Sequence, residues 1–123
     1  MSLIAFVRVW QLGNSGSTVV YEIKYHAEIE HELFDIFLLV EGYAGTIIAQ
    51  AKLKEFEKVF DNLADFPHIG STRDDLRTGL RAIPAGEKGV VCFTVNERDQ
   101  SVFIICVTYA GADWMARVKD REE

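Results

Sequence analysis

Three arginines recur at four-residue intervals near the middle of the 123-residue chain, at Arg73, Arg77 and Arg81. Guanidinium groups stay charged at any physiological pH and bind phosphates and carboxylates through paired hydrogen bonds. Asp74 and Asp75 follow the first arginine, and exposed arginine and aspartate side chains usually pair with each other. The spacing leaves two roles open: the arginines bind a partner, or they hold their own segment in place.

Metal and cofactor chemistry have weaker support in the sequence. His26 with Glu30, and His31 with Asp35, have the i, i+4 spacing that puts two ligands on one helical face, but no third ligand is evident. There is no glycine-rich phosphate loop and no G-x-S-x-G motif. We therefore expect no metal and no cofactor.

The two cysteines lie in apolar, strand-like runs and lack a C-x-x-C spacing, so we expect buried free thiols rather than zinc or redox chemistry. If the last two strands form a hairpin that turns near Arg98, Cys92 and Cys106 fall almost opposite each other. A disulfide in oxidised material is then conceivable.

The charge of the chain is unevenly distributed. The formal net charge is −6, and residues 26–66 carry three lysines against nine acidic residues, which accounts for all of it. The remainder balances, so a locally basic surface in the second half stays open. No run reaches the ~18 apolar residues of a membrane span, and we expect a soluble, cytoplasmic protein with no membrane partner.

The hydrophobic pattern predicts the elements that position these residues. Alternation predicts a strand over Val19–Tyr25, and apolar residues at helical spacing predict one helix from Ala27 to Gly42 and a second from Thr46, its cap, to Pro67. Three strands follow, and Asp113 is expected to cap a short last helix; these elements span Leu80–Ile83, Val90–Val95, Val102–Tyr109 and Trp114–Lys119. The expected fold is α+β, with an antiparallel β-sheet and an N-terminal helical hairpin packed on it in the order β-α-α-β-β-β.

Residues 1–18 include the turn-forming run Gly13–Ser17, which separates the apolar residues before it from the predicted strand at Val19. We interpret them as an N-terminal extension, either an extra strand or a non-native or flexible segment, and residues 19–123 as the domain. Self-association through the extension would give a homodimer, and the sequence leaves the oligomeric state open.

The segment between the two halves carries a family resemblance. Pro67-x-Ile69-Gly70, then Arg73-x-Asp75-Leu76, then Gly79-Leu80-Arg81 entering a strand, resembles the linker of ParE-like toxins of the RelE/ParE superfamily. The resemblance extends from about Val19 to about Trp114. It implies the toxin of a bacterial type II toxin-antitoxin (plasmid stabilisation) system, neutralised by a cognate antitoxin and inhibiting DNA gyrase by protein-protein contact without a cofactor. The residues expected to bind target or partner are Arg73, Arg77, Arg81, Arg98 and Trp114.

Two alternatives come from the same superfamily. A RelE-like toxin is a metal-independent endoribonuclease that cleaves mRNA on the ribosome, and the catalytic residues here would be Arg81 and Tyr109. Cys106 and Ala112 stand where ParE-like chains typically have arginines. A non-toxic member that acts only as a binding module is therefore the third hypothesis.

Overall fold

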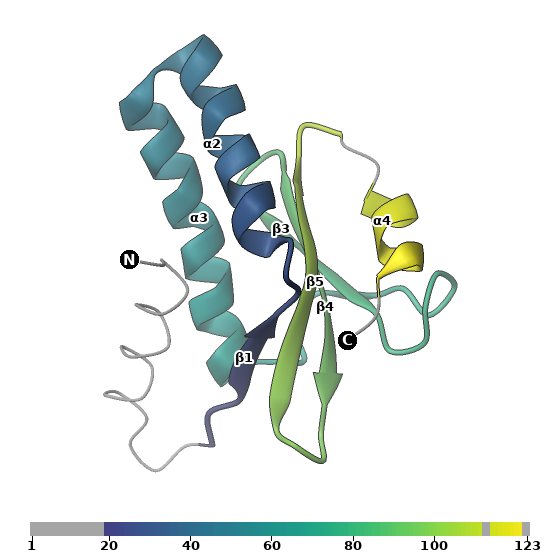
Figure 1. Ribbon diagram of the computed structural model, residues 1–123. Helices are drawn as coiled ribbons and strands as arrows, with labels where there is room; N and C mark the ends of the chain where they lie inside the picture. The colour runs from purple at the N-terminus through teal and green to yellow at the C-terminus, as the bar shows by residue number, and fades with distance from the viewer. Residues whose placement is uncertain (1–18, 112–113, 122–123) are drawn as a thin grey trace.

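The computed structural model describes residues 19–111 and 114–121. Figure 1 shows three layers: the α2–α3 hairpin packs on one face of a sheet and α4 packs on the other. The elements in chain order are β1 (Glu22–Tyr25), α2 (Ile29–Ala44), α3 (Thr46–Asp65), β2 (Ser71–Thr72), β3 (Arg81–Ala85), β4 (Gly89–Asn96), β5 (Ser101–Tyr109) and α4 (Trp114–Asp120). The predicted α+β fold class with a helical hairpin on a sheet is confirmed.

The sheet has the strand order β1-β5-β4-β3-β2. β3, β4 and β5 form the predicted antiparallel meander. One detail differs from the expectation: β1 pairs parallel to β5, with Ile23 opposite Val102, so the sheet is mixed. Alternation within a strand indicates which face is buried but carries no information on the direction of its neighbour.

The two long helices are joined at Gly45, and both ends differ from the predicted ones. α2 runs past Gly42 to Ala44, and Thr46 is the first residue of α3 rather than its cap. Gly45 has a φ of 92° and flanks both helices, which favours a residue without a Cβ. The Thr46 hydroxyl donates instead to the Glu41 carboxylate at 2.9 Å.

Two hydrophobic clusters hold the layers together. The larger one lies between the hairpin and the sheet, where Phe56, Phe60 and Leu63 of α3 are fully buried. The smaller one lies under α4, where Val118 and the half-buried Trp114 pack with Leu80 and the two cysteines. Burial of each large apolar side chain contributes about 1.5–3 kcal/mol, so both faces of the sheet contribute to stability.

The linker between the halves is ordered and contains a two-residue strand, β2, that the sequence analysis did not predict. Ser71 pairs with Ala82 of β3 at the sheet edge. Gly70 precedes this pair with a φ of 88°, and a Cβ there would lie 2.7 Å from the Ala82 carbonyl oxygen. The close approach of two backbones explains the glycine.

Two other expectations meet the limits of the described residues. The proposed extension, residues 1–18, and the proposed cap Asp113 lie outside them, so the domain boundary at residue 19 stays a prediction. Among the helices that the structure describes, none has the length and apolar character to cross a membrane.

Candidate functional site

Arg73 is paired within its own segment, which is one of the two roles that the sequence left open for these arginines. Its Nε and Nη2 donate to the two carboxylate oxygens of Asp75, each at 3.1 Å. The hydrogen bonds from Arg73 hold the pKa of Asp75 below its ordinary value and raise the pKa of Arg73 itself. The guanidinium also lies 5.3 Å from the centre of the Trp114 ring, a cation-π contact that joins the linker to α4.

Arg77 lies on the same side of the molecule. Its Nη1 donates to the backbone carbonyl of Arg121, just after α4. The structure therefore brings three predicted partner-binding residues, Arg73, Arg77 and Trp114, together where the linker meets α4. Much of their bonding capacity is used within the chain.

Arg81 and Arg98 lie elsewhere, near the β4–β5 turn. Nη1 of Arg81 donates to the His68 carbonyl at 2.9 Å, and Arg98 is exposed within the turn. Beside them Glu97 accepts from the Tyr21 hydroxyl at 2.7 Å and contacts Nε2 of His68. These bonds lower the pKa of Glu97, the Tyr21 bond most, and raise the pKa of Tyr21.

Tyr109 is almost buried, at 8% exposure, at the far end of β5. Its hydroxyl is 2.5 Å from that of Tyr43, and Nζ of Lys52 lies 5.2 Å from the centre of its ring. The hydrogen bond between the two phenols raises the pKa of Tyr43. Tyr109 is thus bonded to the last turn of α2, next to the connection at Gly45.

The structure does not bring Arg81 and Tyr109 together. Tyr109 bonds to Tyr43, which precedes α3, whereas Arg81 bonds to His68, which follows α3. α3 has 20 residues and is therefore about 30 Å long. The strand register also separates the two residues, because Arg81 pairs with Phe93 and Tyr109 pairs with Gly89, four residues away on β4 and therefore about 13 Å along it.

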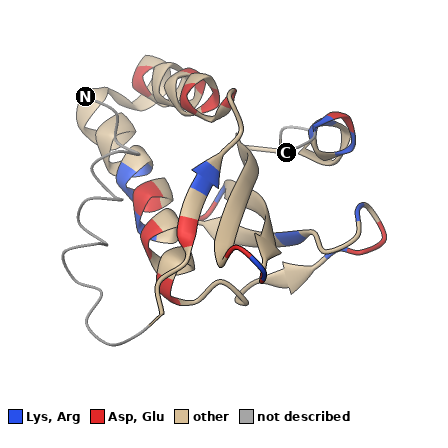
Figure 2. Ribbon diagram, turned by 60° about the horizontal axis from the view of Figure 1, so that its bottom comes forward, with Lys and Arg blue, Asp and Glu red and all other residues tan. Residues whose placement is uncertain are grey.

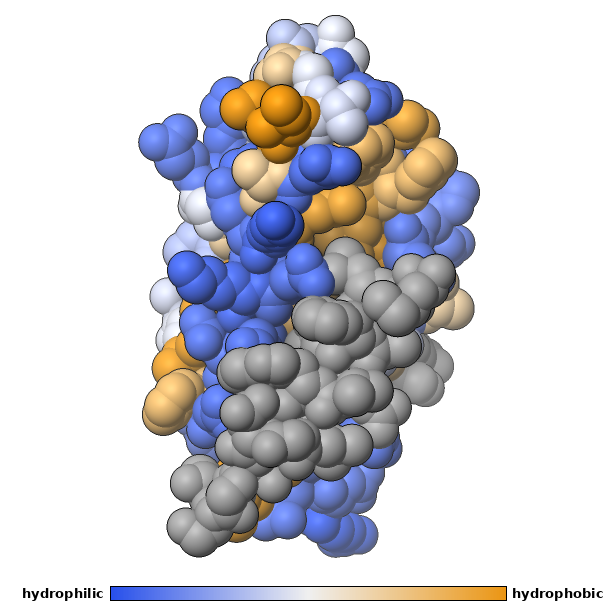
Figure 3. Space-filling view, turned by 90° about the vertical axis from the view of Figure 1, so that its left-hand side faces the viewer, coloured by the Kyte–Doolittle hydropathy of each residue, from blue (hydrophilic) through white to orange (hydrophobic). Residues whose placement is uncertain are grey.

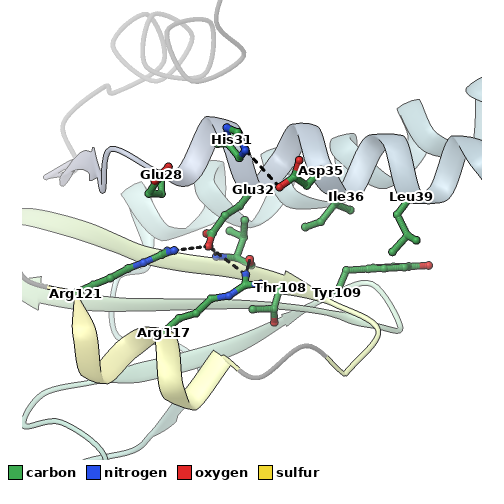
Figure 4. Close-up of a pocket in the computed structure, with 11 residues that line it drawn as sticks. Glu28, His31, Glu32, Asp35, Ile36, Leu39, Thr108, Tyr109, Arg117 and Arg121 are labelled. Atoms are coloured by element: carbon green, nitrogen blue, oxygen red, sulfur yellow. Dashed lines mark hydrogen bonds and ion pairs between the residues drawn. The ribbon is translucent and has the colours of Figure 1, made fainter.

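A buried carboxylate that the sequence analysis did not single out connects three elements. Glu32 of α2 is 8% exposed and accepts from the Val107 backbone N–H at 3.1 Å. Its other oxygen binds Nη2 of Arg121 at 2.7 Å and Nη1 of Arg117 at 3.1 Å. Hydrogen bonding to Glu32 raises the pKa of Arg121, and Figure 4 shows both guanidinium groups pointing at this carboxylate.

This network forms one wall of a pocket of about 360 Å³ between α2, β5 and α4 (Figure 4). The rim of the pocket includes Glu28, just before α2, and His31 and Asp35 on α2. Leu39 of α2 is an apolar lining residue. A signal for Glu32 was present in the sequence, because it lies three residues after Ile29 and four before Ile36, both core-facing. The rim histidine pairs with Asp35 at 3.6 Å, and no group of three or more metal-ligating residues occurs in the described parts of the chain.

The hairpin exposes six large apolar side chains on α2 and at the start of α3. Phe34 and Leu38 are one helical turn apart on α2, so they lie on the same side of it. Figure 3 shows orange surface gathered over this end of the hairpin. We call the following set, 47–80% exposed, the hairpin apolar surface: Phe34, Leu38, Leu39, Tyr43, Ile47 and Ile48.

Charge is distributed differently on the two sides of the sheet. Figure 2 shows acidic positions in red along the hairpin and mainly basic positions in blue on α4. The hairpin apolar surface therefore lies on the acidic side of the molecule, and exposed apolar patches of a protein often mark interaction sites.

Solved structures of toxins and of toxin-antitoxin systems share this fold. The chain aligns with the chromosomal ParDE toxin-antitoxin system from P. aeruginosa with a TM-score of 0.63 at 14% identity, covering 76% of this chain and 99% of that one. An arginine double mutant of E. coli toxin RelE in the free state aligns with a TM-score of 0.57 at 15% identity, covering 79% and 90%. The RelBE2 toxin-antitoxin complex from Mycobacterium tuberculosis gives 0.50 at 17% identity, covering 75% and 100%.

Sequence comparison is more specific. The sequence model of the family described as ParE toxin of type II toxin-antitoxin system, parDE, matches residues 23–114, and the chain therefore belongs to the ParE toxin family. Toxin ParE3 from Caulobacter vibrioides is 49% identical to it over 37 residues. That alignment covers 30% of this chain and only 37% of the relative.

Proposed function

We propose that this ParE-family toxin acts by contact with a protein target, DNA gyrase, and does not cleave RNA. The separation of Arg81 from Tyr109 carries the proposal. Cleavage by a metal-independent ribonuclease needs its acid-base and phosphate-stabilising groups within hydrogen-bond reach of one phosphodiester. Arg81 and Tyr109 are bonded near opposite ends of α3, so they do not meet this requirement.

The target-binding residues in this proposal are the arginines of the second half. Arg98 is exposed in the β4–β5 turn and follows Glu97, whose pKa the charge of Arg81 helps to lower. Arg73, Arg77 and Trp114 form the second group, where the linker meets α4. Arginine and tryptophan are enriched among the residues that dominate protein-protein binding energy.

We also propose that a cognate antitoxin covers the hairpin apolar surface. Its six side chains are exposed, and removal of apolar surface from water is the main favourable term in most protein-protein association. Residues 26–66 carry a net charge of −6, so the segment that binds there should be apolar with basic residues at its edges. The RelBE2 structure, a toxin-antitoxin complex, makes such a partner consistent with the fold.

The test is pulse induction of the chain alone in bacterial cells, followed by measurements of growth, plasmid supercoiling and message integrity. We expect growth arrest with impaired supercoiling and uncut messages. The variant Arg98→Glu should weaken the arrest at least tenfold in the inducer concentration required, as a charge reversal in an interface does. Lys58→Glu, the same charge reversal on the exposed side of α3, is the matched control and should arrest growth like the wild type.

Other results distinguish the alternatives. Arrest with cut messages and normal supercoiling would establish the RelE-like endoribonuclease. Unimpeded growth at good expression would identify a non-toxic binding module. For the antitoxin, co-expression should rescue growth of the wild type but not of Ile47→Asp with Ile48→Asp, whereas Lys54→Asp on the same helix should still be rescued.

A further inference from the structure

The two cysteines face each other across neighbouring strands. Cys92 of β4 stands directly opposite Cys106 of β5 in the antiparallel register. The register shifts just after this pair, because Phe93 lies opposite Ile104, so Cys92 and Cys106 are the last pair before an irregularity in the strands. In a regular antiparallel pair the Cα atoms are about 4.5–5.5 Å apart, within the range of about 4.4–6.8 Å that a disulfide spans. A hydrogen bond with the Cys106 side chain, followed by burial, raises the pKa of Cys92, which agrees with two neighbouring thiols.

Both thiols are covered by α4. Each residue is 0% exposed, and both pack with Leu80 and with Val118 of α4. A buried thiol with a raised pKa reacts slowly, because the thiolate is the reactive form. The cover over the pair therefore determines whether an oxidant reaches it.

α4 is held by a few identifiable contacts. Its 7 residues are too few for a stable isolated helix, so its position depends on contacts with the rest of the chain. Glu32 binds Arg121 at one end, and Arg73 lies over the Trp114 ring at the other. Loss of either contact favours local opening of α4 while the sheet stays intact.

We propose that Cys92 and Cys106 form a two-electron redox site that a peroxide oxidises to an intramolecular disulfide when α4 opens. One thiolate attacks the peroxide, which breaks the O–O bond, releases one water after protonation, and leaves a sulfenic acid on that sulfur. The second thiol attacks this sulfur, the S–S bond forms, and a second water leaves. Two thiols lose two protons and two electrons in total, and hydrogen peroxide is reduced to two waters.

The adjacent thiol determines the product. A sulfenic acid without a neighbouring thiol is oxidised further to sulfinic acid, which is irreversible in most proteins. Here the resolving thiol is directly opposite in the register, so the disulfide forms first and a dithiol reductant restores the site.

The test uses the full chain and hydrogen peroxide. The rate of disulfide formation is followed by intact mass after alkylation of the remaining thiols. Glu32→Gln should form the disulfide at least about 10-fold faster than the wild type, because removal of one partner of a buried ion pair favours opening. Glu30→Gln, an exposed acid on the same helix, is the matched control and should react at the wild-type rate.

Two more variants keep the result decisive. Trp114→Ala removes the contact at the other end of α4 and should also speed disulfide formation, so the test does not depend on Glu32→Gln alone. Cys106→Ser should give sulfenic and then sulfinic acid at Cys92 under the same conditions. Equal rates in the wild type, Glu32→Gln and Trp114→Ala would overturn the proposal. Sulfinic acid as the main product of the folded wild type would also overturn it.

Discussion

Glu32 and Arg121 form a 2.7 Å ion pair. It joins the residue that follows α4 to the first turn of α2, 89 positions earlier in the sequence. The same carboxylate also binds Arg117 and the Val107 backbone, so one side chain connects α2, β5 and α4. The first prediction concerns the energy of this connection.

Glu32→Gln should lower the free energy of unfolding by about 2–4 kcal/mol, because it leaves Arg121 with only part of its hydrogen-bond partners in a site largely shielded from water. Urea unfolding followed by circular dichroism measures the change. Glu30→Gln, the exposed neighbour, should stay within about 0.5 kcal/mol of the wild type. Equal stabilities of the two variants would show that the network does not hold α4.

The second prediction concerns acid stability near the β4–β5 turn. The pKa of Glu97 is lowered from its ordinary value of 4.5, first by the hydrogen bond from Tyr21 and then by that from His68. A lowered folded-state pKa means that the contribution is present above the unfolded-state pKa and is lost as pH falls through the folded-state value. Urea unfolding from about pH 7 to about pH 3 should therefore show Glu97→Gln less stable than the wild type at neutral pH, with the gap closing in acid. A difference in stability between Glu97→Gln and the wild type that does not change with pH would contradict this prediction.

The third prediction tests the close approach at the start of β2. Gly70→Ala should destabilise the protein by about 1–3 kcal/mol, because it combines a positive φ with a Cβ that meets the Ala82 carbonyl. Gly79→Ala has a similar positive φ but open space around the Cβ, so it isolates the backbone cost and should lose less. Thermal unfolding of the two variants separates the steric contact from the conformational strain.

The fourth prediction separates apolar residues that support the fold from those left for a partner. Phe56→Ala, in the core, should cost about 3–5 kcal/mol. Phe34→Ser, on the hairpin apolar surface at 57% exposure, should change stability by no more than about 0.5 kcal/mol and should reduce self-association in concentrated solution. Chemical denaturation and light scattering measure the two effects, and a large stability loss in Phe34→Ser would assign that residue to the fold.

Local chemistry in the sequence predicted a good part of this structure. The alternation and helical spacing located the hairpin and the meander, and the predicted opposition of Cys92 and Cys106 is confirmed by the register. The sequence left open whether these arginines bind a partner or hold their own segment, and the structure shows Arg73 paired with Asp75. In each case the determining residues are close in sequence or belong to adjacent strands.

What the sequence did not predict depends on distant contacts. The parallel pairing of β1 with β5, the position of α4 and the ion pairs of Glu32 each join residues far apart in the chain. Arg81 and Tyr109 looked compatible as a pair because both belong to strands of the sheet, but the length of α3 separates their contacts. No local pattern in the sequence indicates how far apart the side chains of Arg81 and Tyr109 lie in the fold.

The parallel pairing of β1 with β5 also has a consequence for synthesis. Ile23 lies opposite Val102, 79 positions later in the chain, so β1 has no partner in the sheet until β5 has been made. Strand pairs between segments this far apart in the sequence form late in folding. The five-stranded sheet can therefore be completed only after β5, which ends at Tyr109, has been synthesised.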